Sequence, residues 1–349
     1  MKTLFNLIAL FLPLFSFCSG LEGDFVKEKS INKTYTTTST AKVAIDNSYG
    51  NINVYLWNED KIAIQIMIKV TGANETKVEK RLDDIDVNFT ANQNTVRAET
   101  EINGSTWNTN GNLSYEINYI VRIPKNGSIN LTNKYGNIAV EQLNASSVID
   151  LQYGNLNLGR FESKSNTFDL SYCNNSKIDF IDQLNLSSNY CDVTIDKNYG
   201  ANLSGNYNSF QFQHVGNVVL DGNYTKLKST TIQSFTCDGN YLTLNLGDIA
   251  AAKISTNYSS IELNGTNKTK NIVIDCNYSK TKINCGLDFG FDFEISTNYG
   301  NLKENVGLKF TEKSEKTSSK NYSGTSIIAG NSKLKIESNY GNINLFEKL

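Results

Sequence analysis

From residue 128 to the end of the chain, apolar residues recur at fixed offsets from a repeated tyrosine. One apolar side chain stands four residues before that tyrosine, and others stand three, five and eight residues after it. Within each segment apolar and polar positions alternate, which is the pattern of a strand with one buried face. The pattern therefore predicts an all-β chain whose repeats supply short strands joined at corners.

The repeated tyrosine is usually preceded by asparagine and is often followed by glycine. Its copies are Tyr135, Tyr153, Tyr172, Tyr190, Tyr207, Tyr224, Tyr241, Tyr258, Tyr278, Tyr299 and Tyr340. Their spacing is 17 to 19 residues as far as Tyr258, and the later steps are 20, 21 and 41. A period of this length in strand-forming sequence is typical of a parallel β-solenoid (a β-helix), in which each repeat forms one turn.

The apolar positions form three inward columns: one four residues before the tyrosine, one three and five residues after it, and one eight residues after it. Three columns separated by corners predict that the coil is three-sided, with turns of 17–20 residues. The tyrosine shares its parity with the residues two and four before it, so we expect all three side chains to face the same side of one strand. The asparagine before the tyrosine tolerates corner dihedrals, and we expect these asparagines to bond amide to amide up the stack.

Residues 1–20 have the pattern of an export signal. Lys2 precedes an apolar run from Leu4 to Phe17, and small residues follow. Cleavage by signal peptidase is favoured over lipid attachment at Cys18, because Phe17 stands where a lipidation site needs a small residue. No later stretch is long and apolar enough for a membrane span. The sequence thus predicts an exported protein of the periplasm, the cell surface or the extracellular space.

Residues 21–127 lack the regular period, apart from one copy of the motif at Tyr49. Most of this region reads as strands, and the capping box Thr76-x-x-Glu79 predicts one short helix. We interpret it as a β-rich N-terminal cap that covers the first edge of the repeats in residues 128–349.

The repeat region contains irregular features as well. After Tyr172 the apolar pair is displaced to Ile178 and Phe180, which predicts a bulge or a longer corner. The charged segment 311–320 predicts a protruding loop. The last turn ends with little sequence to cover it, so end-to-end self-association is expected.

Composition and motifs exclude several classes of function. The net charge is −2 and there is no basic stripe, so nucleic acid is not an expected partner. His214 is the single histidine and no Cys-x-x-Cys occurs, which argues against zinc sites and Ser-His-Asp catalysis. No cofactor is expected. We read His214 as a surface residue.

Five cysteines follow the export signal. Cys173 and Cys191 each come directly after a repeated tyrosine in adjacent repeats, so they are a possible disulfide pair. Cys237 and Cys276 fall at inward positions and are expected to be small buried residues.

Acidic residues recur three positions before the tyrosine. They are Asp150, Asp169, Asp221, Asp238 and Asp275. In neighbouring turns two carboxylates would stand about 5 Å apart, near the separation in retaining glycosidases, and such a pair could also bind calcium. Serines occupy the same column in other repeats, however, so the residues are better explained as interchangeable polar positions. The sequence identifies no catalytic residue and no metal ligand.

The unit Tyr135-Gly136-Asn137-Ile138-Ala139-Val140 has a close copy at Tyr49 and another at Tyr340. With the strand end Arg122-Ile123-Pro124, these units resemble the bacterial secreted β-strand-repeat proteins known as the putative adhesin family. The resemblance implies a β-helix-like fold and a location outside the cytoplasm, and it carries no catalytic residues.

The expected function is therefore that of an exported, non-enzymatic adhesin or cell-envelope binding module. Its expected partner is a glycan, a matrix component or an envelope protein. A polysaccharide-active enzyme that uses stacked aspartates and a periplasmic scaffold or signalling partner remain the alternatives.

Overall fold

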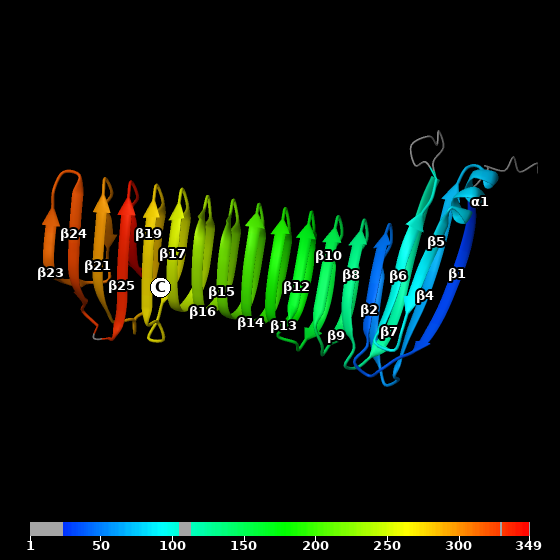
Figure 1. Ribbon diagram of the computed structural model, residues 1–349. Coiled ribbons are helices and arrows are strands. Elements are labelled where there is room, and N and C mark those ends of the chain that lie inside the picture. The colour runs from blue at the N-terminus through cyan, green and yellow to red at the C-terminus, as the bar shows by residue number, and fades with distance from the viewer. Residues whose placement is uncertain (1–23, 105–112, 329, 349) are drawn as a thin grey trace, which may run out of the picture.

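The computed structural model describes residues 24–104, 113–328 and 330–348, which are all-β apart from one helix. The 26 strands of these residues belong to one mixed sheet. Figure 1 shows them side by side in a long row, with β1 (Phe25–Thr36) at one end and β23 (Leu308–Glu315) at the other. No helix in these residues is long and apolar enough to cross a membrane. The predicted export signal and Cys18 lie outside the described residues.

The regular part of the row consists of repeats that lie parallel and in register. Its first strands are β8 (Ser128–Lys134), β9 (Ile138–Leu143), β10 (Ser147–Gln152), β11 (Leu156–Phe161) and β12 (Asn166–Ser171). Five longer strands follow: β13 (Asn174–Asn189), β14 (Asp192–Asn206), β15 (Ser209–Asn223), β16 (Lys226–Asn240) and β17 (Thr243–Asn257). Between β14 and β15, Leu203 lies beside Leu220, 17 residues later. The long parallel stacking predicted from the period is confirmed.

The inward columns form the core. The residues four before each repeated tyrosine are at most 3% exposed: Leu131, Ile149, Phe168, Leu186, Leu203, Leu220, Cys237, Ile254, Ile274, Ile295 and Ile336. The third column is buried too, but Leu143 and Phe161 stand at the ends of β9 and β11. In this part each repeat therefore supplies two strand segments, and the third column lines a corner rather than a third strand.

The irregular repeat after Tyr172 contains the expected bulge. The register between β13 and β14 shifts between Asn174 and Ser176, and Asn175 has a φ of 116°. The extra residue moves the inward pair along the strand, so Ile178 and Phe180 are the residues that are buried.

The N-terminal region begins the row. Its remaining elements are β2 (Lys42–Ser48), β3 (Ile52–Trp57), β4 (Lys61–Gly72), α1 (Glu75–Asp83), β5 (Ile85–Ala91), β6 (Thr95–Ile102) and β7 (Leu113–Pro124). Strands β2 and β3 lie parallel to β8 and β9 on one side and to β6 and β7 on the other. The unit around Tyr49 is thus stacked as a repeat. Strands β1, β4 and β7 pair antiparallel beyond it.

The predicted helix is present, but it begins differently. Its N-cap is Asn74, whose side chain accepts a hydrogen bond of 3.0 Å from the backbone nitrogen of Lys77. The capping box expected at Thr76 is therefore wrong in position. Val78 is buried, and Lys27 of β1 forms ion pairs with Glu75 and Glu79 at 2.7 and 2.9 Å.

The C-terminal strands do not follow the order of the sequence. They are β18 (Ser260–Gly265), β19 (Asn271–Asn277), β20 (Lys280–Cys285), β21 (Phe291–Asn298), β22 (Leu302–Glu304), β24 (Ser319–Ser326), β25 (Ser332–Asn339) and β26 (Ile343–Glu347). Strand β25 lies between β19 and β21, as Figure 1 shows, and β26 pairs with both β20 and β22. The expectation that the last repeat forms an uncovered end is wrong.

A hairpin covers this end instead. Segment 311–320, expected as a protruding loop, forms parts of β23 and β24, and β24 pairs antiparallel with β21. The outermost strand β23 carries Lys309, Lys313 and Glu315, and charges on an edge strand oppose pairing with another chain. End-to-end self-association stays a prediction, but its expected basis in an open last repeat is absent.

The buried core predicts where the fold is sensitive to substitution. Phe235→Ala removes a side chain that is 0% exposed, and we expect it to lower the free energy of unfolding by about 3–5 kcal/mol. Thr236→Ala changes the adjacent exposed position and is expected to stay within about 0.5 kcal/mol. Urea unfolding followed by circular dichroism measures both, and equal midpoints for the two variants would contradict the assigned core.

Candidate functional site

Tyrosines form a continuous stack along one edge of the molecule, which we call the tyrosine ladder. In spatial order its members are Tyr49, Tyr135, Tyr153, Tyr172, Tyr190, Tyr207, Tyr224, Tyr241, Tyr258, Tyr278, Tyr340 and Tyr299. Neighbouring ring centroids are 4.6–5.2 Å apart. The ring planes lie within 24° of parallel. The stack follows the spatial order of the strands, because Tyr340 stands between Tyr278 and Tyr299.

The ladder tyrosines point outward, against expectation. Their exposed fractions run from 39% for Tyr49 to 65% for Tyr299. Each has a φ between 51° and 61°, in the left-handed region. Because the strand turns at the tyrosine, its side chain no longer follows the alternation that buries the residues two and four before it. The prediction that all three share one face is therefore wrong for the tyrosine.

The left-handed turn is costly for tyrosine, and the stack offsets that cost. A non-glycine residue in this conformation costs about 1–2 kcal/mol. A stacked aromatic pair returns about 0.5–1.5 kcal/mol, and each further ladder member adds one such pair. Hydrogen bonding also continues through the turn, since the Tyr224 backbone nitrogen donates to the Asn240 carbonyl at 3.0 Å. The tyrosine is thus held by its neighbours in the row.

The asparagines before the tyrosines form the expected amide ladder. From Asn206 to Asn298, the side-chain oxygen of each asparagine accepts a hydrogen bond from the side-chain amide nitrogen of the next asparagine in the row, at 2.7–3.1 Å. These repeating hydrogen bonds keep the corners of adjacent repeats in register. The ladder is a structural feature, and it fixes the position of the tyrosine that follows.

The residue after the tyrosine explains the Tyr-Gly-Asn motif. A β-carbon at Gly136 would lie 1.8 Å from the Gly50 carbonyl oxygen, so no side chain fits where these two repeats meet. The following asparagine then bonds along the row, and Asn51 Oδ1 accepts from the Asn137 backbone nitrogen at 2.9 Å. In the middle repeats the position after the tyrosine holds a buried side chain instead, such as Leu242.

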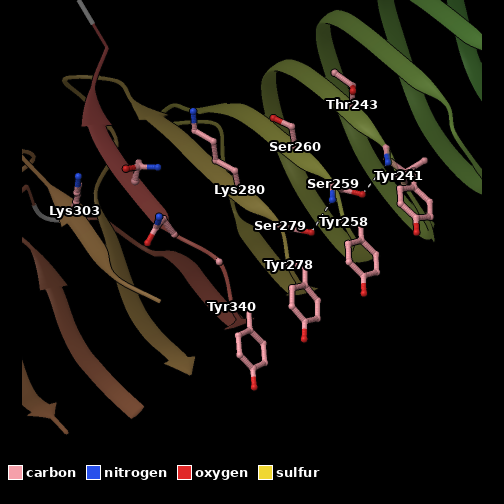
Figure 2. Close-up of a pocket in the computed structure, with 14 residues that line it drawn as sticks. Tyr241, Thr243, Tyr258, Ser259, Ser260, Tyr278, Ser279, Lys280, Lys303 and Tyr340 are labelled. Atoms are coloured by element: carbon pink, nitrogen blue, oxygen red, sulfur yellow. Dashed lines mark hydrogen bonds between the residues drawn. The ribbon is translucent and has the colours of Figure 1, made fainter. Parts of the chain in front are cut away.

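A groove runs beside the ladder near its C-terminal end. Its volume is about 760 Å³, and Figure 2 shows four ladder tyrosines along one side of it. The other lining side chains include Thr243, Ser260, Lys280, Lys303, Asn342 and Asn344. They come from β17, β18, β20, β22 and β26 and the turns that precede these strands. A smaller groove of about 580 Å³ lies beside Tyr49 and Tyr135 at the other end.

The groove is polar and positively charged. No carboxylate lines it, and Lys280 and Lys303 have no ion-pair partner among the described residues. The neighbouring Lys282 is paired with Glu262 at 2.8 Å, and this hydrogen bond holds the pKa of Glu262 below its usual range. Two free ammonium groups beside hydroxyl and amide groups suit an anionic, hydroxyl-rich ligand.

The stacking limits how the tyrosines could contact a ligand. Each interior ring is covered on both faces by its neighbours, so it presents an edge and a hydroxyl group. Figure 2 shows the four hydroxyls of Tyr241, Tyr258, Tyr278 and Tyr340 in one row. At the N-terminal end Tyr115 packs edge-on against Tyr49 with centroids 4.9 Å apart. The ladder therefore offers a regular row of hydrogen-bonding groups rather than flat surfaces for stacking.

The aspartates considered for catalysis or calcium binding do not form a site. Asp221 lies beside Asp238 on adjacent strands, and Asp150 lies beside Asp169, but Asp275 has Glu337 as its acidic neighbour. Burial, with a further contribution from Asp169, raises the pKa of Asp150. These aspartates line none of the grooves described here, and the described residues contain no cluster of three or more potential metal ligands.

His214 lies on the surface, where its Nδ1 is 2.9 Å from the hydroxyl of Thr231. Cys237 and Cys276 are buried, as expected. Cys173 and Cys191 are neighbours in the core as free thiols, and the Cys191 sulfur accepts a hydrogen bond of 3.4 Å from the Cys173 backbone nitrogen. A disulfide between them stays a prediction.

Sequence reasoning missed the two lysines of the groove. Lys280 stands two residues after a ladder tyrosine, and Lys303 stands four after another. Their repeats, centred on Tyr278 and Tyr299, are consecutive in sequence but are separated in space by the repeat of Tyr340. The sequence contains no signal for this insertion, so the grouping was not predictable.

These features define an all-β protein of stacked parallel repeats with an exposed aromatic ladder. Its sequence matches no protein-family model. It also matches no curated protein.

Solved structures show a distant likeness. A putative cell adhesion protein from Clostridium sporogenes is 12% identical, with 92% of this chain and 100% of that chain covered and a TM-score of 0.22. A putative adhesin from Bacteroides fragilis is 13% identical, with coverages of 92% and 97% and a TM-score of 0.30. A putative lipid binding protein from Parabacteroides distasonis is 10% identical, with coverages of 90% and 96% and a TM-score of 0.33. Superpositions this loose support no conclusion about function.

The balance between strain and stacking can be measured at Tyr224. Tyr224→Phe keeps the ring and is expected to change stability little. Tyr224→Ala keeps the left-handed cost but loses the stack, and we expect a loss of about 1–3 kcal/mol. Tyr224→Gly loses the stack but removes a cost of about 1–2 kcal/mol, so it should fall between the other two. Urea midpoints in the order Phe, Gly, Ala are expected, and alanine matching phenylalanine would contradict the account.

Burial predicts the reactivity of the thiols. Burial raises the pKa of Cys237 and of Cys285 to about 12. Because the thiolate is the reactive form, we expect both to resist alkylation in the folded protein at pH 8 and to react after denaturation. Mass spectrometry after denaturation without reductant also tests the predicted disulfide: Cys173 and Cys191 are both labelled if they are free and both unlabelled if they are bridged.

Proposed function

We propose that this protein is an exported, non-enzymatic β-solenoid that binds an acidic glycan in the groove beside its tyrosine ladder. The observation that carries the proposal is the composition of that groove. It combines a row of tyrosine edges with hydroxyl and amide groups and two free lysines, and its lining contains no carboxylate. A carboxylated or sulfated sugar chain presents the matching groups, namely hydroxyls with regularly spaced anions.

The solenoid part of the proposal rests on the register. Parallel neighbours are offset by one period along both strand segments of the repeat, as in β8 with β10 and β9 with β11. The same offset holds along the whole of β14 and β15. A chain that moves to the next parallel strand position once per period forms a coil, and the buried columns fill the inside of that coil.

An elongated partner fits the shape of the site. The ladder runs from the repeat of Tyr49 to that of Tyr299, and a second groove lies beside its N-terminal end. A small molecule would occupy one groove, whereas a polymer could contact successive repeats. Many weak contacts along a chain then add to the binding strength without a deep pocket. Adhesion to a glycan at the cell envelope uses binding of this kind.

Catalysis is the less favoured function. The paired aspartates stand apart from the grooves, and partial burial together with the like-charged Asp169 accounts for the raised pKa of Asp150. A scaffold that binds an envelope protein is a third possibility, and the binding experiment below separates the three.

Binding to acidic and neutral glycans should differ, and the difference should depend on the two lysines. On an array that includes uronic-acid and sulfated polymers, we expect binding to acidic members that weakens as salt is added. The double variant Lys280→Glu with Lys303→Glu should bind about tenfold or more weakly, which corresponds to about 1.4 kcal/mol. Lys253→Glu is the control, because Lys253 is exposed but does not line the groove.

A reducing-end assay on the bound polymers completes the experiment. Release of sugar that Asp150→Asn or Asp221→Asn abolishes would replace the proposal with a polysaccharide-active enzyme. Equal binding by the double variant and the control would show that the groove is not the site. Binding to no glycan at all would leave the scaffold as the better explanation.

A further inference from the structure

The C-terminal repeat occupies a slot between two repeats that precede it in the sequence. We call residues 332–347, which comprise β25 and β26, the terminal repeat. Strand β25 pairs in parallel with β19 on one side and β21 on the other, and β26 pairs with β20 and β22. The slot walls are therefore formed by chain that ends at residue 304, before the terminal repeat is reached.

The slot fits a repeat that supplies a stacking tyrosine, a hydrogen-bonding asparagine and inward apolar side chains. Tyr340 stacks between Tyr278 and Tyr299 with centroids 4.8 and 4.9 Å away. The amide of Asn339 bonds to Asn277 and to Asn298, both at 2.7 Å. The inward side chains of the terminal repeat are at most 1% exposed: Leu334, Ile336, Ile343 and Leu345. Without this unit, two strand pairs would face each other across a gap one strand wide.

The terminal repeat reaches its slot by crossing over the chain. Strand β24 lies on the outer side of β21, whereas β25 lies on its inner side. The connection between them must pass the start of β21. At the crossing, a β-carbon on Gly330 would lie 2.1 Å from the carbonyl oxygen of Gly290. Insertion into the chain's own slot thus depends on a close contact between two glycines.

We propose that the terminal repeat is exchangeable, so that the terminal repeat of a second copy of this chain can fill the slot. Every contact inside the slot is the same whether the unit comes from the same chain or from a second copy. Only the connection differs, and the exchanged form does not require the crossing at Gly330. Such an exchange is the usual low-cost route to a domain-swapped dimer.

The described units in the middle of the row, from Tyr135 to Tyr258, offer no comparable route. The other units between Tyr135 and Tyr278 stack on the units next to them in the sequence. Exchange of one of these units with a second copy would break the strand pairing on both of its sides. The strand at the C-terminal end of the row is charged. At the C-terminal end of the row, the slot is therefore where a second copy fits without loss of existing pairing.

Cross-linking between two variants that each carry one added cysteine tests the exchange, with the five buried natural cysteines left in place. Asp275 and Glu337 are partner residues on β19 and β25. Neighbouring strands are about 4.8 Å apart, which is within the reach of a disulfide. One full-length chain carries Asp275→Cys and the other carries Glu337→Cys, so this bridge forms only if one chain inserts into the other. The two are mixed at high concentration in mild denaturant, refolded, oxidised and analysed on a non-reducing gel with mass spectrometry.

The expected result is a covalent heterodimer joined at these two positions. The matched control replaces Asp275→Cys with Asp221→Cys, which puts the thiol on an exposed aspartate of a distant repeat and should give no specific bridge. Equal yields from both pairs would reveal random collision and count against exchange.

Substitution at the crossing supplies an independent measurement. Gly330→Ala blocks the chain's own insertion and should raise the dimer from a minor to the major species in light scattering. Gly286→Ala makes the same change at the same end of the molecule, where the nearest neighbours of the new β-carbon are 3.1 Å away, and should stay monomeric.

A folded, monomeric Gly330→Ala protein together with the absence of the specific heterodimer would overturn the proposal. If Gly330→Ala fails to fold, the cross-link, which uses the natural glycine, decides alone: its presence supports exchange and its absence refutes it.

Discussion

The left-handed turn at each ladder tyrosine is the constraint on which the rest of the structure depends. The turn is unfavourable for a tyrosine alone, and it becomes acceptable only when a second ring stacks on the first. Each repeat is therefore stabilised by its neighbour, and a repeat in isolation would have little reason to adopt this corner. Once the corner is fixed, the preceding asparagine falls into the amide ladder and the residues two and four before the tyrosine point into the core. Register along the row is a consequence of this one local interaction.

The sequence predicts the columns and the period because both follow from alternation along strands, as at Leu203 and Leu220. It fails at the tyrosine because alternation assumes an extended backbone, and a φ near 57° reverses the side chain. It fails at segment 311–320 for a different reason: β23 is exposed along most of its length, so a strand forms there without an apolar alternation to reveal it.

The order of the C-terminal strands lies beyond what any such pattern can show. Equivalent repeats present the same columns to either neighbour, so the unit of Tyr340 matches the unit of Tyr278 as well as that of Tyr299. The sequence specifies that repeats stack, but it does not specify which repeat stacks on which. The sequence therefore does not predict the candidate groove, because Lys280 and Lys303 are brought to one site only by the inserted repeat. The lysines are visible in the sequence, whereas their proximity is a property of the topology.

The groove and the slot are consequently one piece of architecture. Tyr340 and Asn342 of the terminal repeat line the groove together with Lys280 on one side and Lys303 on the other. In an exchanged dimer the first two residues would come from one chain and the lysines from its partner, with unchanged geometry. A ligand that contacts the groove alone would then bind the monomer and the exchanged dimer equally well. Because a ligand shifts an equilibrium only through a difference in affinity, occupancy of one groove would not drive exchange. A polymer long enough to reach the grooves of both chains would favour the dimer, since its second contact becomes intramolecular.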